Sequence, residues 1–252
     1  MQKIPPHYPE VLKDARDDDI PALLEREADA ERNKKGHFTR SLASTLRLIA
    51  VLSFLVESDV DQFRACMRAA TERRVRLIDQ FEAGEPIIPD CVSMMRYQQL
   101  LDAAASGHFD VARALADRLG GRPKIESLDL RAFEIAMGYT MKAVVIGDDA
   151  MALERLPALE KACHHKSYAN FSGYALALRG IASGDTALVK TAFSELLAGH
   201  RRLSKGRGLF SDTVDKYLSV WGLGMLNLAR SRGVDVSVDD PLIPPALVIE
   251  LR

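Results

Sequence analysis

The densest group of chemically able side chains in the sequence is Cys163, His164 and His165, within LEKACHHKSYANF at residues 159–171. Cysteine and histidine are the residue types of nucleophilic catalysis and of zinc binding, so both chemistries are candidates. Adjacent histidines, however, point about 100° apart on a helix and to opposite sides of an extended segment. The one spaced acid is Glu160, four residues before His164, whereas a zinc site needs three or four ligands.

The same stretch can also be interpreted as the end of a helix. Leu159 to Cys163 would finish the helix, and His164 and His165 would be cations near its negative C-terminal end. Pro157 complicates this interpretation, because a proline kinks or restarts a helix. The sequence also has no P-loop, no dinucleotide-binding glycine motif and no G-x-S-x-G. We therefore expect no catalytic residue, no metal, no cofactor and no enzymatic activity.

The composition indicates which elements carry these residues. Aromatic residues make up only 6% of the 252 residues, while Ala, Leu and Arg are abundant, a mixture that favours helices over strands. We therefore expect an all-α fold. The net charge is -1, so no overall field attracts nucleic acid or anionic lipid, and we expect neither as a direct partner.

Cysteine usage and hydropathy bear on the compartment. The three cysteines, Cys66, Cys91 and Cys163, have no C-x-x-C spacing, which is typical of a reducing environment. The first residues lack the apolar core of a secretory signal, and the most apolar run, 48–56, is much shorter than the roughly 20 residues of a membrane-spanning helix. A cytoplasmic location is expected.

Prolines and glycines divide the chain into segments. Residues 1–40 are expected to form an N-terminal extension and a polar helix that stops at Gly36. Residues 41–252 are expected to form one helical-repeat domain: a hairpin at 41–84, a repeat body at 90–232 and a tail at 233–252. Within the body, the apolar spacing predicts a last helix over 213–231.

Three segments of the body can be superimposed with Gly107, Gly147 and Gly184 in register, at offsets of 40 and 37 residues. Glycine suits the left-handed end of a first helix, and Asp148 or Asp185 directly after it can cap a second. A degenerate copy carries Ser58 in the glycine position. The pattern predicts stacked antiparallel helical hairpins in a tetratricopeptide-like, α-solenoid-like array.

Several stretches together resemble the immunity protein 49 family of bacterial polymorphic toxin systems. They are the RYQQLLDAAASGHFDVARALADRL, GDDAMALERL and SGDTALVKTAFSELLAGHRR units and the ending YLSVWGLGMLNLARSRGVDVSVDDPLIPPALV. The resemblance implies an all-α protein that binds and neutralises a cognate antibacterial toxin, such as a nuclease, by steric blocking of its active site. It brings no catalytic residues with it.

A nuclease toxin would present a basic face, so acids on exposed inter-helix connections are the candidate partner-binding residues. We expect these to be Glu126 and Asp129 in GGRPKIESLDL, and Asp212 and Asp215 in LFSDTVDK. The basic segment HRRLSKGRG at 200–208 is better explained as a solvated helix end than as a phosphate site, and His200 as a histidine at the edge of the core.

Two alternatives remain at this stage. Tetratricopeptide-like proteins share the helical pattern of the repeat units. The first alternative is therefore a scaffold that binds a peptide or protein partner in its groove. A helical hydrolase that uses the His164 and His165 region is the other. Gene context separates the first alternative from an immunity protein, because an immunity gene lies beside its toxin gene.

Overall fold

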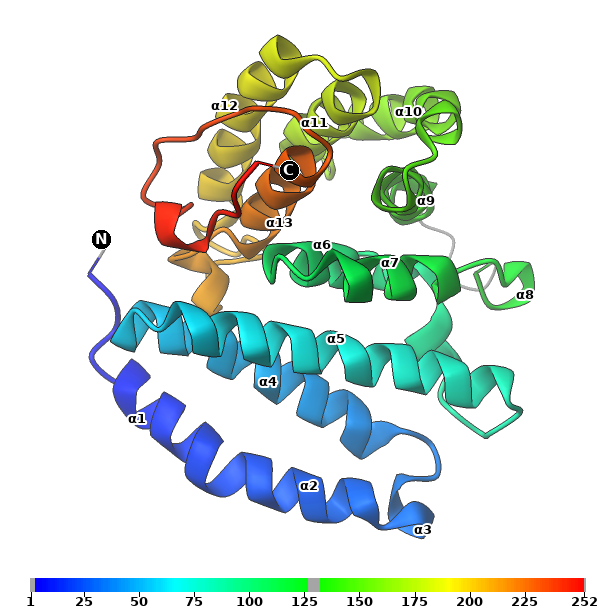
Figure 1. Ribbon diagram of the computed structural model, residues 1–252, viewed down its shortest axis with the longest axis vertical. Coiled ribbons are helices and arrows are strands. Elements are labelled where there is room, and N and C mark those ends of the chain that lie inside the picture. The colour runs from blue at the N-terminus through cyan, green and yellow to red at the C-terminus, as the bar shows by residue number, and fades with distance from the viewer. Residues whose placement is uncertain (1–2, 127–131, 252) are drawn as a thin grey trace.

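The computed structural model describes residues 3–126 and 132–251, and these residues contain helices, turns and one isolated bridge but no strand (Figure 1). The predicted all-α class is confirmed. In chain order, the α-helices are α1 (Tyr8–Asp14), α2 (Ile20–Ala28), α3 (Ala30–Asn33), α4 (His37–Glu57), α5 (Val60–Glu82), α6 (Gln98–Ala105), α7 (Phe109–Arg118), α8 (Pro123–Glu126), α9 (Ala132–Ile146), α10 (Asp149–Cys163), α11 (Ser172–Ser183), α12 (Thr186–Leu203) and α13 (Val220–Ser231).

The short turns between them include a π-helical turn and several 3-10 turns. The π-helical turn η1 (Ala15–Asp19) joins α1 to α2, and the 3-10 turns are η2 (Pro89–Val92), η3 (Met94–Arg96), η5 (Ala169–Phe171), η6 (Val214–Lys216) and η7 (Pro245–Leu247).

The helices lie in layers that follow the chain for most of its length. Helices α1 and α2 run along α4, the long pair α4 and α5 lies next to them, and α6 and α7 cover α5 (Figure 1). Beyond α7 the order continues through α9, α10, α11 and α12, each packed against the next. Helix α13 departs from this order, since it packs mainly against α6 rather than against α12.

The predicted turns are present with the predicted backbone conformation. Gly107, Gly147 and Gly184 have φ angles of 76°, 89° and 68°, and Ser58 in the fourth, degenerate copy has φ 57°. After Gly184, the Asp185 side chain accepts a hydrogen bond from Leu188 N at 2.9 Å and so begins α12. Asp148 and Asp59 cap α10 and α5 in the same way. These four turns set the antiparallel course of the helices.

The predicted last helix begins later than expected. It was predicted over 213–231, but α13 starts at Val220, and residues 214–216 form the 3-10 turn η6. The reason is a contact that local sequence does not encode: Ser219 N donates to the carbonyl of Leu242 in the tail at 2.9 Å. The Ser219 hydroxyl then accepts from Gly222 N at 3.3 Å and caps the helix.

Other boundaries follow the sequence closely. Gly36 and Gly233 have positive φ angles and follow α3 and α13 as expected. Pro157 lies inside α10, which continues through it. The polar N-terminal helix is divided at Asp29, whose side chain caps α3. Tyr8 and the following turns of α1 join the same buried core as the helices after residue 41.

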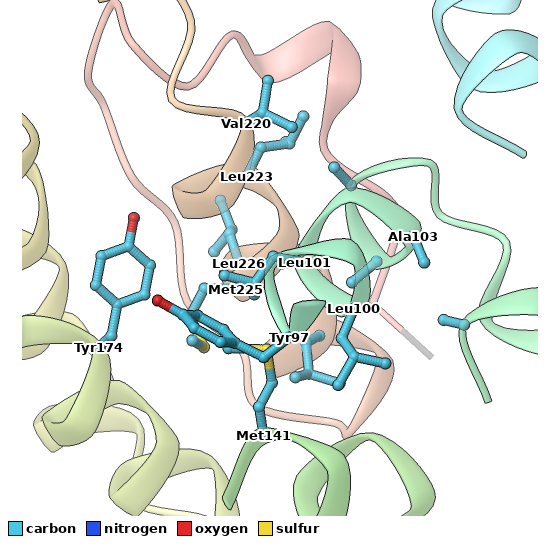
Figure 2. Packing of buried hydrophobic residues seen from close by; sticks show 14 of the residues in the cluster. Tyr97, Leu100, Leu101, Ala103, Met141, Tyr174, Val220, Leu223, Met225 and Leu226 are labelled. Atoms are coloured by element: carbon cyan, nitrogen blue, oxygen red, sulfur yellow. The ribbon is translucent and has the colours of Figure 1, made fainter. Parts of the chain in front are cut away.

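The centre of the core lies between α6 and α13. Leu100 and Leu101 from α6 interleave with Leu223 and Leu226 from α13, and all four are at most 1% exposed (Figure 2). Burying one such side chain stabilises a fold by about 1.5–3 kcal/mol. The backbones also approach closely, because a Cβ atom at Gly224 would lie 2.2 Å from the carbonyl oxygen of Leu101.

Helix α4 is the one helix in the described ranges that is long and apolar enough to cross a membrane. Within the fold, 56% of its most apolar window is buried between α2 and α5, as in the core helix of a soluble protein.

Candidate functional site

The Cys163 cluster is the end of a helix. Helix α10 finishes at Cys163, and His164 follows as its C-terminal cap, so the helix-end interpretation is confirmed. The Cys163 side chain is buried, and burial raises the pKa of its thiol to about 11, which keeps it protonated at neutral pH. His164 and His165 are exposed, and His165 Nδ1 accepts a hydrogen bond from Ser167 N at 3.3 Å. The charged neighbours that act on the thiol, Glu160 and Glu195, raise its pKa further and so oppose formation of a nucleophilic thiolate.

Glu160, the acid considered as a metal ligand, is engaged elsewhere. Its two carboxylate oxygens accept from Arg179 Nε at 2.7 Å and Nη2 at 2.8 Å, a bidentate pair between α10 and α11. Among residues 3–126 and 132–251, no group of three His, Cys, Asp or Glu side chains is placed to hold a metal ion.

Glu126, the first predicted contact residue, is not on an exposed connection. It lies in α8 and is only 7% exposed. Its Oε2 accepts from the Tyr139 hydroxyl at 2.8 Å, and its Oε1 accepts from Met94 N at 3.3 Å. The expectation of exposure was wrong here because α8 folds back onto η3 and α9. Asp129 lies outside the described residues.

Asp215 is also buried, while its neighbour Asp212 is exposed as expected. The Asp215 carboxylate accepts from Arg47 Nη2 at 3.0 Å, and the same guanidinium contacts Asp102 Oδ1 through Nε at 2.9 Å. Arg74 Nη1 completes the group at 3.2 Å from Asp102 Oδ2. Four charged side chains from α4, α5, α6 and η6 thus meet inside the molecule.

The ionisation of this buried group follows from its surroundings. Burial disfavours the charged Arg47 guanidinium, but Asp102 and Asp215 outweigh burial and raise its pKa. For Asp215, burial is the largest effect and raises the pKa of the carboxyl group, because Arg47 offsets only part of it. Removing one member would therefore leave an uncompensated charge in the interior.

His200 anchors the segment 209–217 that carries Asp212. Its Nε2 hydrogen-bonds to the carbonyl of Asp215 at 2.9 Å, which requires Nε2 to carry the proton, and Nδ1 lies 3.2 Å from the Ser219 hydroxyl. Phe210 stacks on the imidazole at 4.5 Å and meets the Trp221 ring edge-on at 5.2 Å. His200 is 2% exposed, so it belongs to the core rather than to its edge.

The segment exposes three side chains, those of Leu209, Asp212 and Thr213. Leu209 is 53% exposed, the most exposed large hydrophobic residue in the described ranges, and Asp212 is exposed three residues later. A hollow of about 620 Å³ lies beside the segment, lined by α1, by α4 and by residues 211–217. We call this region, from Leu209 to Tyr217 with the adjoining hollow, the 209–217 surface.

A second hollow, of about 530 Å³, lies on the other side of Arg47. Leu209, Tyr168 and Trp221 line it together with polar side chains of α6. The aromatic rings around it form a packed group, in which Phe133 stacks on Tyr168 at 4.3 Å and tilts against Phe171 at 5.2 Å. Trp221 is half-buried and packs against Tyr97, as expected of a residue of the core.

The basic segment 200–208 ends α12 and continues into a turn. Arg201 pairs with Asp240 of the tail at 2.5 Å, and Arg202 donates to Asn170 at 2.6 Å. Lys205 and Arg207 are exposed. Two of the four cations therefore hold the tail and the 170 turn in place.

Comparison with known proteins gives no match: no family model matches the chain, and no characterised protein and no solved structure is significantly similar to it.

Proposed function

We propose that the protein is an immunity protein that binds a cognate antibacterial toxin in the cytoplasm and neutralises it by covering the toxin's active site. The observation that carries the proposal is the 209–217 surface, where Leu209 and Asp212 are exposed on a segment that Phe210 and Asp215 anchor to the interior. A preorganised surface binds with a smaller loss of conformational entropy than a flexible loop does.

The rest of the fold suits this role as a scaffold. The helical hairpins α4–α5, α9–α10 and α11–α12 would act as the units of a tetratricopeptide-like array whose rigid layers hold the contact segment in place. Neutralisation by steric blocking needs surface complementarity and no chemistry of its own.

Leu209 and Asp212 have different parts in the proposed contact. Leu209 is exposed at the hollow of about 530 Å³ and is a candidate apolar anchor, and such anchors contribute most of the affinity of an interface. An acid at the rim steers a basic toxin face and accelerates association. Of the four acids considered from the sequence, Asp212 carries the proposal, because Glu126 and Asp215 are paired inside the molecule. Asp129 stays a candidate.

The test is co-expression with the product of the neighbouring gene. We expect rescue of growth and a stable complex. Leu209→Ala should weaken that complex about ten-fold or more, and Asp212→Lys should slow association, most strongly at low salt. Surface plasmon resonance at two salt concentrations measures both effects.

Glu154→Lys is the matched control, because Glu154 is an exposed acid on α10. It should leave affinity and association rate unchanged. A neighbouring product that is harmless, or that forms no complex, would contradict the immunity proposal. If neither Leu209→Ala nor Asp212→Lys changes the affinity or the association rate, the 209–217 surface is not where the toxin binds.

A peptide-binding scaffold is the second candidate, and one observation favours it. The hollow of about 530 Å³ has aromatic and apolar side chains beside polar ones, the mixture typical of sites for peptides and small molecules. Tyr168→Leu separates the candidates, because Tyr168 lines this hollow and stacks on Phe133 rather than on the segment 209–217: it should impair peptide binding while sparing the contact through Leu209 and Asp212.

A further inference from the structure

A third hollow holds three arginines from three different elements. It has a volume of about 290 Å³ and lies where α4, α5, α6 and η3 meet, close to the lower limit for small-molecule sites. Its polar lining consists of Arg40, Ser44, Arg74, Cys91, Arg96 and Gln99.

The arginines are arranged by depth. The Arg74 side chain is 9% exposed and forms the floor, whereas those of Arg40 and Arg96 are 43% and 40% exposed and stand at the mouth. Arg74 is fixed by Asp102, so its position does not depend on a ligand. A buried, fixed guanidinium with two more exposed ones above it can surround a small group on several sides.

The carboxylates nearby do not balance these charges. Arg40 and Arg96 both donate to one oxygen atom, Oδ2 of Asp90. Arg74 shares Asp102 with Arg47, which also takes Asp215. The two groups together contain four guanidinium groups, from Arg40, Arg47, Arg74 and Arg96, and three carboxylates, from Asp90, Asp102 and Asp215.

The arginines also have more N–H donors than the nearby carboxylates use. A guanidinium group has five N–H donors, and the described contacts of Arg40, Arg74 and Arg96 with carboxylates occupy one donor on each. Burial lowers the pKa of Arg74 despite the attraction of Asp102, and the like charges of Arg47 and Arg96 act in the same direction. An anion in the hollow would relieve that repulsion and accept hydrogen bonds from the remaining N–H groups of the three arginines.

Gln99 adds a feature that selects among anions. The Gln99 side chain lines the hollow, and its Oε1 is buried with no hydrogen-bond partner among the described residues. An unpaired buried acceptor is costly, so a turn of the Gln99 side chain that lets a ligand donate a hydrogen bond to Oε1 is favoured. Phosphate species with an O–H group can do this, whereas a simple carboxylate cannot.

We propose that this hollow binds a small oxyanion, with the anionic oxygens held by Arg40, Arg74 and Arg96 and an O–H group of the ligand donating to Gln99. Arginine recognises phosphate and carboxylate in the same bidentate way, so both are compatible with the cations, and Gln99 favours phosphate. The site does not depend on toxin binding, and Ser44 lies between it and the hollow beside the 209–217 surface, since it lines both.

The experiment is a thermal-shift and calorimetric titration of the full chain with inorganic phosphate, acetate and sodium chloride at matched ionic strength. We expect saturable stabilisation by phosphate, weaker stabilisation by acetate and none by chloride, because binding to the native state raises the Tm with ligand concentration. Matched ionic strength removes simple screening as an explanation.

Arg40→Met and Arg96→Met test the residues at the mouth, where substitution leaves the buried Arg74 in place. Each should weaken phosphate binding at least ten-fold, and Arg96→Lys should weaken it less, since it keeps the charge and loses the fork geometry. Arg68→Met on α5, an exposed arginine paired with Glu72, is the control and should bind phosphate as the wild type does.

Two results would overturn the proposal. One is the absence of saturable stabilisation by either oxyanion beyond that of chloride. The other is unchanged phosphate affinity in both Arg40→Met and Arg96→Met, which would place the anion elsewhere. If neither small anion binds while these substitutions abolish binding to a protein partner, the hollow receives an acidic side chain of that partner instead.

Discussion

His200 is the buried residue that holds the 209–217 surface against α13, and it does so as a neutral imidazole. Its Nε2–H donates to a carbonyl, and its Nδ1 is free to accept from Ser219. Burial is the main reason that its pKa falls from 6.5 to about 4; the Asp215 carbonyl and Asp240 oppose this shift, and Arg201 adds to it. Protonation would remove the acceptor at Nδ1.

The stability of the protein should therefore depend on the protonation of His200. Between pH 6.5 and about 4 the unfolded chain binds the proton and the folded chain does not. The contribution of neutral His200 to the free energy of unfolding is complete above pH 6.5 and is lost as the pH falls towards 4. The loss is about 3 kcal/mol at most. His200→Gln should lose this part of the pH dependence in urea unfolding at pH 7 and pH 4.

The exposed His37 provides the control, because His37→Gln should keep the wild-type pH dependence. If His200→Gln and the wild type lose stability equally between pH 7 and pH 4, His200 is not the group responsible.

Sequence reasoning succeeded for elements that local chemistry determines. A turn with positive φ followed by a capping Asp can be predicted from the pairs Gly147-Asp148 and Gly184-Asp185. The copy with Ser58 in the glycine position was predicted in the same way. It failed where a partner lies far along the chain. The start of α13 depends on Leu242 in the tail, and the pairing of Asp215 depends on Arg47, 168 residues away. Nothing in LFSDTVDK distinguishes the buried Asp215 from the exposed Asp212.

Arg47 joins α4 to α6 through Asp102 and to η6 through Asp215. Removing it should therefore destabilise the packing of these elements. Arg47→Met should leave Asp102 and Asp215 buried without their main partner and destabilise the protein by about 3–5 kcal/mol. The control is Arg16→Met, since Arg16 pairs with Glu57 at 33% and 41% exposure and should cost about 1 kcal/mol or less. Urea denaturation measures both.

Adding Asp215→Asn to Arg47→Met should recover part of the lost stability, because the unpaired Asp215 charge is then removed while Asp102 keeps Arg74 as its partner. Equal costs for Arg47→Met and Arg16→Met would mean that water reaches the group and that it is not buried in solution.

At the scale of the whole molecule, α13 distinguishes this fold from a linear stack. A linear array would end on α12, whereas α13 returns to α6 and the tail follows it (Figure 1). Asn227 connects the three parts: its amide donates to the carbonyls of Ala105 and Leu247, and its oxygen accepts from Ile249 N. The helical layers are thereby joined across 122 residues of sequence.

The close approach of α13 to α6 requires Gly224. A Cβ atom there would lie 2.2 Å from the Leu101 carbonyl oxygen, and because this is backbone of a buried helix it cannot move aside as a flexible side chain would. Gly224→Ala should separate the two helices and cost about 3 kcal/mol or more in urea unfolding. Gly184→Ala is the comparison: it has φ 68° but no atom within 4 Å, so it should cost only about 1–2 kcal/mol of backbone strain. Equal costs for the two substitutions would show that α13 can shift relative to α6 without loss, and the closure would then not be what stabilises the molecule.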